Sequence, residues 1–405
     1  EIPVNPEVIE LAENIANDPL LFKKRINLVN KLGVIGEQRT IGLYTLVLDS
    51  ALLPLGSGSS EALAAKNSGP YGAGKSYPLF VTLKIYPKSA YRLITNGSAK
   101  SLYNLKDGLK HKTLILTEAL SLQGTTGDNE LSYAIRSLVS EGQLTYQYTG
   151  FEDKEKVTIT QKLEGPTSLL TTTIKGKLEE QLEDRLVQIH PNSSAPQTQA
   201  IISQTAEIAS GMLQPVDEKI IKAWKLFYRS LDNVDVVIPY APGISNYVAQ
   251  IGSLPLSARR AFKRAISGIK TLALMHQFQR EKNEYGRIIA EMSDYAIAYQ
   301  LMKDAFLEGL GQEKRSTYRR FELIYKEGII TAKRISEITG VTGAAISQWM
   351  KPFILKGVLI WCDEHGIQFP DKESLSKAKR SGNAYVKMNG PFGLPSPYDL
   401  TGDDR

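Results

Sequence analysis

The sequence has few of the residues that build covalent or metal-bound frameworks. Its 405 residues include one cysteine, Cys362, and four histidines. A single cysteine excludes an internal disulfide framework and a cysteine-based metal site, and so few histidines argue against a histidine-rich one. A reducing compartment is the simplest setting for such a chain.

Long hydrophobic runs are also missing. There is no uninterrupted apolar stretch of about 18 residues and no signal-peptide layout, so we expect a cytoplasmic protein that does not cross a membrane. The chain begins at Glu1 rather than at methionine, from which we expect a fragment of a longer polypeptide.

Charge of both signs is plentiful. Hydrophobic residues make up 42% of the chain and charged residues 23%, which is typical of a globular protein. Lysine and arginine exceed aspartate and glutamate by 49 to 43, a net charge of +6. This excess fits a polyanionic partner, although a merely basic surface explains it equally well.

The pattern of apolar residues changes along the chain. Residues 6–52 are expected to be helical, because apolar residues recur every three or four positions after Pro6. From residue 61 to about 190, short apolar runs alternate with amphipathic stretches, which predicts an α/β sheet with crossover helices. The candidate strands are "YRLI" (91–94), "TLIL" (113–116), "TSLLTT" (167–172) and "LVQIH" (186–190).

Three further segments complete the pattern. Residues 142–165 alternate polar and apolar residues on both sides of a charged tip, which predicts a long β-hairpin. Residues 201–230 and 257–308 are again expected to be helical. The tail from Asp371 onward is polar and rich in Gly, Pro and Ser, and is expected to be an extended or disordered arm.

A glycine-rich stretch, "NSGPYGAGKSYPLF", carries the strongest motif. Gly69, Gly74, Lys75 and Ser76 fit the pattern G-x-x-x-x-G-K-[ST] without a gap. In such a loop backbone N–H groups surround phosphates, the lysine reaches the β and γ oxygens and the serine hydroxyl ligates Mg²⁺. The alternative is a flexible turn before a helix.

Three later signals suit hydrolysis. The run "HKTLILTEAL" contains Glu118, placed to polarise an attacking water, although it is also an ordinary strand-end carboxylate. A strand ending in Thr171 and Thr172 would put hydroxyls beside the nucleotide. Arg185 would reach a neighbouring subunit's phosphates, although such an arginine more often forms a surface salt bridge.

The order of these motifs resembles a known family. "GAGKS", "LKHKTLILTE", "LEGPTSLLTTT", "EDRLVQIHPNSSAPQTQAI" and "ARRAFKRAISGIKTLALMHQFQR" look like the AAA+ helicase part of mobile-element and phage-type primase-helicases, whose motor is similar to the minichromosome maintenance (MCM-like) helicases. The likeness covers roughly residues 20–365. It implies a ring-forming, hexameric ATPase that moves on single-stranded DNA.

The resemblance implies a role for each matching residue. The nucleotide contacts would be Gly69, Gly72, Gly74, Lys75 and Ser76, the last also holding Mg²⁺. Glu118 would be the catalytic acid, Thr172 the first sensor, Arg185 the trans-acting finger and Arg260 the second sensor, with Arg259 and Arg264 as open alternatives to Arg260. Two residues depart from the family pattern: Thr117 replaces an acid and Tyr71 replaces a small loop residue.

The hairpin at about 142–165 would then point into the central pore of the ring. The DNA-contacting candidates are the lysines Lys154, Lys156 and Lys162 for phosphates and the aromatic residues Tyr146, Tyr148 and Phe151 for stacking. Acidic residues at the tip bring its net charge near zero, so a solvated turn is the alternative.

Residues near the C-terminus predict a helix-turn-helix within a winged-helix domain. Thr331 and Thr342 would each cap a helix, and "VLIW" would form a strand. Gln348 and Lys351 on the second helix, beside Ser347, are candidates to face DNA. Contact with protein is the alternative for this surface.

These inferences predict an α/β protein in five parts. The parts are an N-terminal helical region (1–55), an AAA+ P-loop ATPase domain (56–280), connecting helices (281–314), a C-terminal winged-helix domain (315–368) and an extended or disordered tail (369–405).

The predicted function is that of an ATP-dependent DNA helicase in the replication of a mobile element or phage. Its cofactors would be ATP and Mg²⁺, and its partners single-stranded DNA, further copies of the chain in a hexamer, and a primase module or another replication protein. The alternative is an ATP-switched initiator or loader that does not unwind processively. The long hairpin favours the motor, because a simple switch can lack it.

Overall fold

The computed structural model divides into two compact units. It describes residues 5–56, 59–95, 102, 105, 107–117, 130–152, 155–173, 178–212, 215–251, 254–310, 315–355 and 357–401. The first unit is made of Glu1–Pro239 and Phe262–Leu301, and the second of Tyr240–Ala261 and Met302–Arg405.

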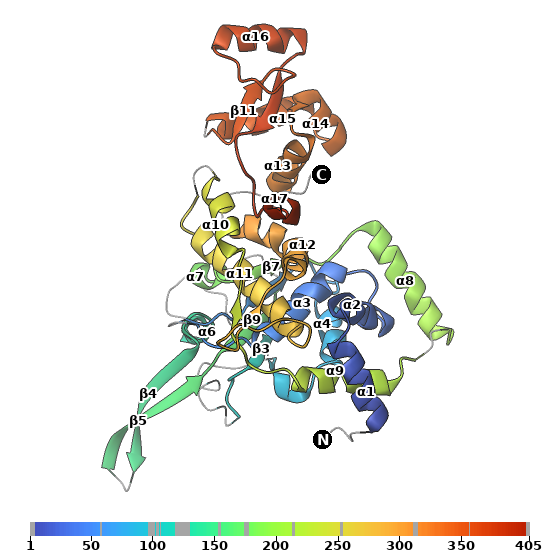
Figure 1. Cartoon of the computed structure of the whole chain (residues 1–405), viewed down its shortest axis with the longest axis vertical. Helices are drawn as coiled ribbons and strands as arrows, with labels where there is room; N and C mark the ends of the chain where they lie inside the picture. Colours follow the sequence, from blue (N-terminus) through green and yellow to red (C-terminus); the bar gives the residue numbers. More distant parts are fainter. Residues whose placement is uncertain are drawn as a thin grey trace. The chain divides into compact units, whose positions relative to one another are not determined.

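The first unit is an α/β structure (Figure 1). Its helices are α1 (Pro6–Ala16), α2 (Leu21–Lys31), α3 (Gln38–Ser50), α4 (Ser76–Leu83), η1 (Lys88–Ala90), α6 (Glu130–Glu141), α7 (Glu180–Glu183), α8 (Ala195–Ala209) and α9 (Glu218–Arg229). Its strands are β1 (Ala64–Ser68), β2 (Tyr91–Ile94), β3 (Lys112–Leu116), β4 (Gln143–Glu152), β5 (Glu155–Glu164), β6 (Thr167–Thr173), β7 (Val187–Ile189), β8 (Val236–Val237) and β9 (Ile288–Ile289). Helices α11 (Ala258–Met275) and α12 (Met292–Gly309) have residues in both units.

A five-stranded parallel sheet lies at the centre of this unit, in the order β2-β3-β6-β1-β7. The four strands expected from their apolar runs are confirmed as β2, β3, β6 and β7. β1 also forms, although Ala64 and Ala65 have little preference for strands, because it pairs with β6 on one side and β7 on the other. Its buried position between two neighbours outweighs the weak propensity.

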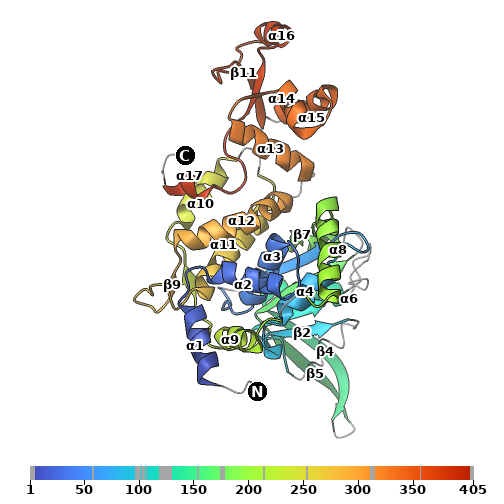
Figure 2. The same ribbon diagram turned by 90° about the vertical axis from the view of Figure 1, so that its right-hand side faces the viewer.

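Helices cover both faces of the sheet. On one face, α6 packs with sheet residues Leu114 and Leu169 in a buried apolar cluster. On the other, Ser168 Oγ donates to Thr113 Oγ1 at 2.8 Å, and Thr113 approaches the Leu48 carbonyl of α3. Helices α2, α3 and α4 lie together (Figure 2). The predicted N-terminal helices therefore form, but they share a compact unit with the sheet.

The predicted hairpin is confirmed as β4 and β5, paired from Gln143↔Glu164 to Glu152↔Glu155. Leu144 and Leu163 at its root are buried in the same cluster as α6. Beyond this root the hairpin extends away from the sheet (Figure 1). Its outer part is therefore supported by its own pairing.

The second unit combines short helices with a three-stranded antiparallel sheet, in the order β10-β12-β11. Its elements are α10 (Ala241–Ala249), α13 (Arg315–Glu327), β10 (Ile330–Thr331), α14 (Ala332–Thr339), α15 (Gly343–Leu355), β11 (Leu359–Cys362), α16 (Lys372–Ser381), β12 (Tyr385–Met388) and α17 (Pro397–Thr401). Thr331 caps α14 by accepting from Arg334 N at 3.1 Å, as expected. The winged-helix assignment itself stays a prediction.

The expectation of an extended or disordered tail at 369–405 is wrong where α16, β12 and α17 form. Asp371 caps α16 by accepting from Ser374 N at 2.7 Å. β12 is the central strand of the small sheet, and its Val386 is fully buried. Composition did not indicate these elements, because α16 has no buried residue and β12 has only four residues. Pairing with β10 on one side and β11 on the other stabilises β12.

No helix among these described ranges is long and apolar enough to cross a lipid bilayer.

Candidate functional site

The glycine-rich loop connects β1 to α4 and needs glycine for two different reasons. Gly72 and Gly74 have φ angles of +75° and +72°, which residues with a Cβ rarely adopt, and a Cβ built on either would meet open space. At Gly69 a Cβ would lie 3.0 Å from Pro191 Cγ, so a side chain there would force the proline to shift. The loop is thus open on the side of Gly72 and Gly74 and closely packed at Gly69.

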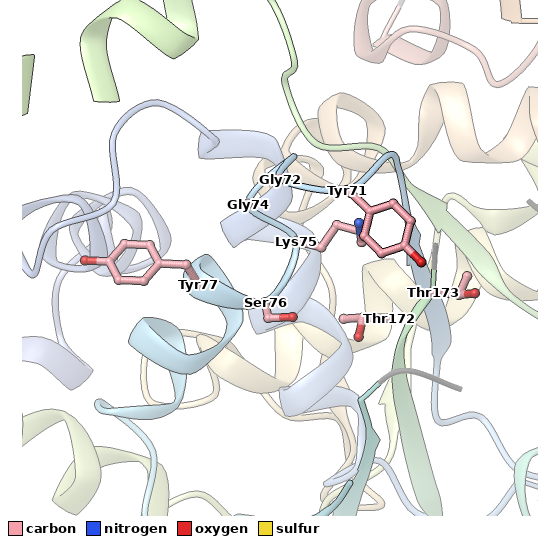
Figure 3. Close-up of a pocket in the computed structure, with 8 residues that line it drawn as sticks. All are labelled: Tyr71, Gly72, Gly74, Lys75, Ser76, Tyr77, Thr172 and Thr173. Atoms are coloured by element: carbon pink, nitrogen blue, oxygen red, sulfur yellow. The ribbon is translucent and has the colours of Figure 1, made fainter. Parts of the chain in front are cut away.

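A pocket of about 280 Å³ lies at this loop (Figure 3). Its lining residues are Tyr71, Gly72, Gly74, Lys75, Ser76, Tyr77, Thr172 and Thr173. The sheet brings the two segments together, because β1 and β6 are parallel neighbours with Asn67 opposite Thr172 and Ser68 opposite Thr173. Their carboxyl ends therefore meet at one edge, where α/β sheets commonly bind ligands.

The lysine of the motif points into the loop. Lys75 Nζ donates to the carbonyls of Gly69 at 2.8 Å and Pro70 at 2.6 Å. Ser76 begins α4, so the unpaired N–H groups of a helix N-terminus lie beside this ammonium group. Positive charge, backbone donors and left-handed glycines together fit a chain of phosphates, and the Ser76 hydroxyl fits a magnesium ligand.

The structure brings together five residues that the sequence singled out: Gly72, Gly74, Lys75, Ser76 and Thr172. Their roles in binding stay predictions. Thr173, the next residue on β6, also lines the pocket and was missed. Tyr71 lies at the pocket with 82% of its surface exposed, so a large side chain is accommodated in the loop.

The predicted catalytic acid, Glu118, lies outside the described residues, as does Lys154 of the hairpin. β3 ends at Leu116, which is opposite Thr171 of β6, and Thr117 N donates to the Ile94 carbonyl at 3.3 Å. The carboxyl end of β3 therefore lies at the same sheet edge as Thr172.

The predicted arginines occupy different surroundings. Arg185 Nε donates to Ser140 Oγ of α6 at 2.6 Å, and its side chain also donates to the Gln181 carbonyl. Arg264 is buried and donates to the Asp184 carbonyl, next to Arg185 in sequence. Arg259 and Arg260 are exposed on α11 in the second unit. Arg185 does not line the pocket of its own chain, and its role stays a prediction.

Two tyrosines and two lysines of the hairpin lie on opposite faces, whereas the third aromatic candidate, Phe151, pairs with Lys156. Tyr146 and Tyr148 lie two residues apart on β4, so they share a face, and their rings stack at 5.7 Å. Cross-strand partners also share a face, and Lys162 is opposite Thr145 whereas Tyr146 is opposite Gln161. The same alternation puts Lys156 on the face of Lys162. The tyrosines therefore lie on one face and the lysines on the other.

The candidate DNA-facing residues of the second unit are exposed on α15, whose only charged residue is Lys351. α16 carries a lysine whose surroundings the sequence did not predict. Lys379 Nζ lies 4.3 Å from the centre of the Trp361 ring, within the range of a cation–π interaction. Burial and the neighbouring charge of Lys351 lower the pKa of Lys379. Within the described residues neither lysine has an acidic partner.

A comparison with known protein families supports the assignment of the glycine-rich loop as a P-loop. Residues 57–234, which include every element from β1 to α9, match a protein-family model described as the MTBMA_p00010 P-loop domain. No curated protein matches the chain. The first unit therefore contains a P-loop domain on an α/β sheet, an arrangement suited to binding a nucleotide with Mg²⁺.

Proposed function

We propose that the chain is an AAA+ ATPase that assembles into a hexameric ring and moves on single-stranded DNA, as a helicase in the replication of a mobile element or phage. The P-loop domain and the pocket support the ATPase part of this proposal. The ring, the helicase activity and the biological setting rest on the resemblance in sequence and on the hairpin.

One observation carries the motor part. β6 supplies Thr172 and Thr173 to the pocket, and it begins only two residues after β5 ends, with Gly165 and Pro166 between them. A change at the pocket can therefore act on the hairpin along one strand. A motor needs such a link between its nucleotide and its track.

The chemistry assigned to the pocket is phosphoryl transfer. Lys75 would bind the β and γ oxygens, and Ser76 would hold Mg²⁺, which would neutralise charge on the phosphate oxygens during transfer to water. Glu118 would orient water, and Arg185 of a neighbouring chain would stabilise the transition state. The lysine face of the hairpin would contact DNA phosphates, with Lys351 and Lys379 as a further site.

The test is DNA-stimulated ATP hydrolysis and the opening of a forked duplex. The wild-type chain should hydrolyse ATP faster with single-stranded DNA and open the fork, whereas Lys75→Ala should do neither. The mass of the assembly with an ATP analogue and single-stranded DNA should be that of a closed ring. ATP-dependent DNA binding without fork opening would instead support an initiator or loader.

A further inference from the structure

A buried hydrogen-bond chain lies beneath the P-loop. Tyr44 of α3 is 1% exposed, and its hydroxyl donates to the backbone carbonyl of Lys75 at 2.9 Å. The same hydroxyl oxygen accepts from Asn67 Nδ2, and Asn67 is also 1% exposed. The order of the chain is therefore Asn67, Tyr44 and the Lys75 carbonyl.

This chain connects the two ends of the loop. Asn67 lies on β1, just before the loop begins, and Lys75 is the last residue before α4. Tyr44 comes from a helix that sequence patterns assigned to a separate N-terminal region. It therefore joins the end of the strand to the start of the helix on the side away from solvent.

The contact with the Lys75 carbonyl also orients a donor. The carbonyl of Lys75 and the N–H of Ser76 belong to one peptide group, and in a trans peptide they point in opposite directions. A carbonyl held toward Tyr44 therefore directs the Ser76 N–H away from Tyr44. Ser76 lines the pocket, so this is the direction from which a phosphate would approach.

Two properties keep the chain of hydrogen bonds in place. Burial raises the pKa of Tyr44, so its hydroxyl stays protonated and remains a donor. Asn67 Oδ1 is buried and has no hydrogen-bond partner within the described residues. Such an atom costs stability, and an apolar residue would avoid that cost. The Asn67 side chain therefore lowers the stability of the fold through Oδ1, while its Nδ2 donates to Tyr44.

We propose that Tyr44 is a positioning residue for the phosphates of the nucleotide, and that Asn67 holds it in place. Tyr44 fixes the first peptide group of α4, so that the Ser76 N–H and the lysine of the loop face the phosphates. This inference rests on nucleotide binding at the P-loop, as in the proposed function. It makes α3 part of the nucleotide site.

The direct test is Tyr44→Phe, which keeps the ring and removes only the hydroxyl. Its matched control is Tyr228→Phe, because Tyr228 is also buried in the first unit and its hydroxyl has no hydrogen-bond partner in the described part of the chain. The dissociation constant of Mg²⁺–ATP, measured by calorimetry well below the melting temperature, should rise about tenfold for Tyr44→Phe. It should stay within about twofold for Tyr228→Phe, because no hydrogen bond is lost.

A second measurement distinguishes positioning from a general loss of structure. Adenosine has no phosphates, so its inhibition constant in a competition assay should be unchanged by Tyr44→Phe, whereas a collapsed site would weaken ATP and adenosine alike. If Tyr44→Phe does not fold, Asn67→Leu is the second variant. It removes the hydrogen bond from Asn67 to the Tyr44 hydroxyl and should weaken ATP binding in the same way.

The outcomes separate this inference from the proposed function. If wild type binds no ATP, or Lys75→Ala binds it equally well, the nucleotide site itself is wrong. If wild type binds and Lys75→Ala does not, then wild-type affinity in Tyr44→Phe overturns only the role of Tyr44. Equal losses in Tyr44→Phe and Tyr228→Phe also overturn it.

Discussion

The P-loop pocket and the β4–β5 hairpin belong to the same compact unit, but different contacts hold them. The pocket lies at the edge of a parallel sheet, where β1 has a neighbour on each side and Tyr44 supports the loop from below. The hairpin is joined to the core by Leu144 and Leu163 at its root.

The pocket and the hairpin therefore suit different tasks. The pocket suits the precise placement of reacting groups, and the hairpin suits contact with a moving polymer. Phosphoryl transfer requires groups held within a few tenths of an ångström, which support from the neighbouring strands and from Tyr44 would provide. A polymer that slides past a surface requires many modest contacts instead. Changes at the pocket should therefore affect turnover, and changes on the outer hairpin should affect DNA binding at little cost in stability.

The largest effect is expected for Arg185→Ala. If Arg185 completes a neighbour's pocket, ATP turnover should fall by roughly 10³-fold or more with nucleotide affinity nearly unchanged. Ser140→Ala is the control, because it removes the hydroxyl that Arg185 contacts and leaves the guanidinium group. Steady-state hydrolysis and calorimetry measure the two quantities. Wild-type turnover in Arg185→Ala would exclude the role between subunits.

The second prediction compares the root of the hairpin with its outer part. Leu163→Ala should lower the free energy of unfolding by about 2–5 kcal/mol, because Leu163 is 5% exposed within the core cluster. Tyr148→Ala should cost about 1 kcal/mol, mostly from the lost stacking with Tyr146. Urea unfolding gives both values. Equal losses would mean that the outer hairpin is packed as firmly as its root.

The third prediction distinguishes the two faces of the hairpin. Lys156→Ala with Lys162→Ala should weaken binding of single-stranded DNA and reduce the salt dependence of the affinity, because two phosphate contacts are lost. Tyr146→Ala with Tyr148→Ala should weaken binding by about 1–3 kcal/mol for each stacked base and leave the salt dependence unchanged. Fluorescence anisotropy at several salt concentrations tests this. Identical salt slopes for both double variants would contradict the separation of faces.

Sequence patterns predicted much of the first unit because its signals are local. The runs at 91–94 and 167–172 are short apolar segments in an alternating pattern, and both became strands of the central sheet. The motif at Gly69–Ser76 predicted the loop before α4, in which Gly74 adopts a left-handed backbone and Gly69 packs closely against Pro191. Weak local signals failed elsewhere. β12 was taken for part of a tail, because nothing within its four residues shows the two strands that pair with it.

Other features depended on register and on distant contacts. Alternation along β4 puts Tyr146 and Tyr148 on one face, but which face Lys156 and Lys162 share depends on the pairing across the turn. The contact between Tyr44 and Lys75 joins residues 31 apart in sequence and matches no motif. Lys379 of α16 lies beside Trp361 of β11, a contact between two elements that no local pattern joins.

The sequence by itself determined the chemical groups of the proposed nucleotide site, because a phosphate loop needs glycine, lysine and serine at fixed spacing along one short segment. Tertiary structure alone decided other features around that loop: Thr173 beside it, Tyr44 beneath it, and the register that puts Tyr146 and Lys162 on opposite faces of the hairpin. The physical reason is that a turn forms from neighbouring residues, whereas strand order, cross-strand register and buried hydrogen bonds form only when distant segments pack together.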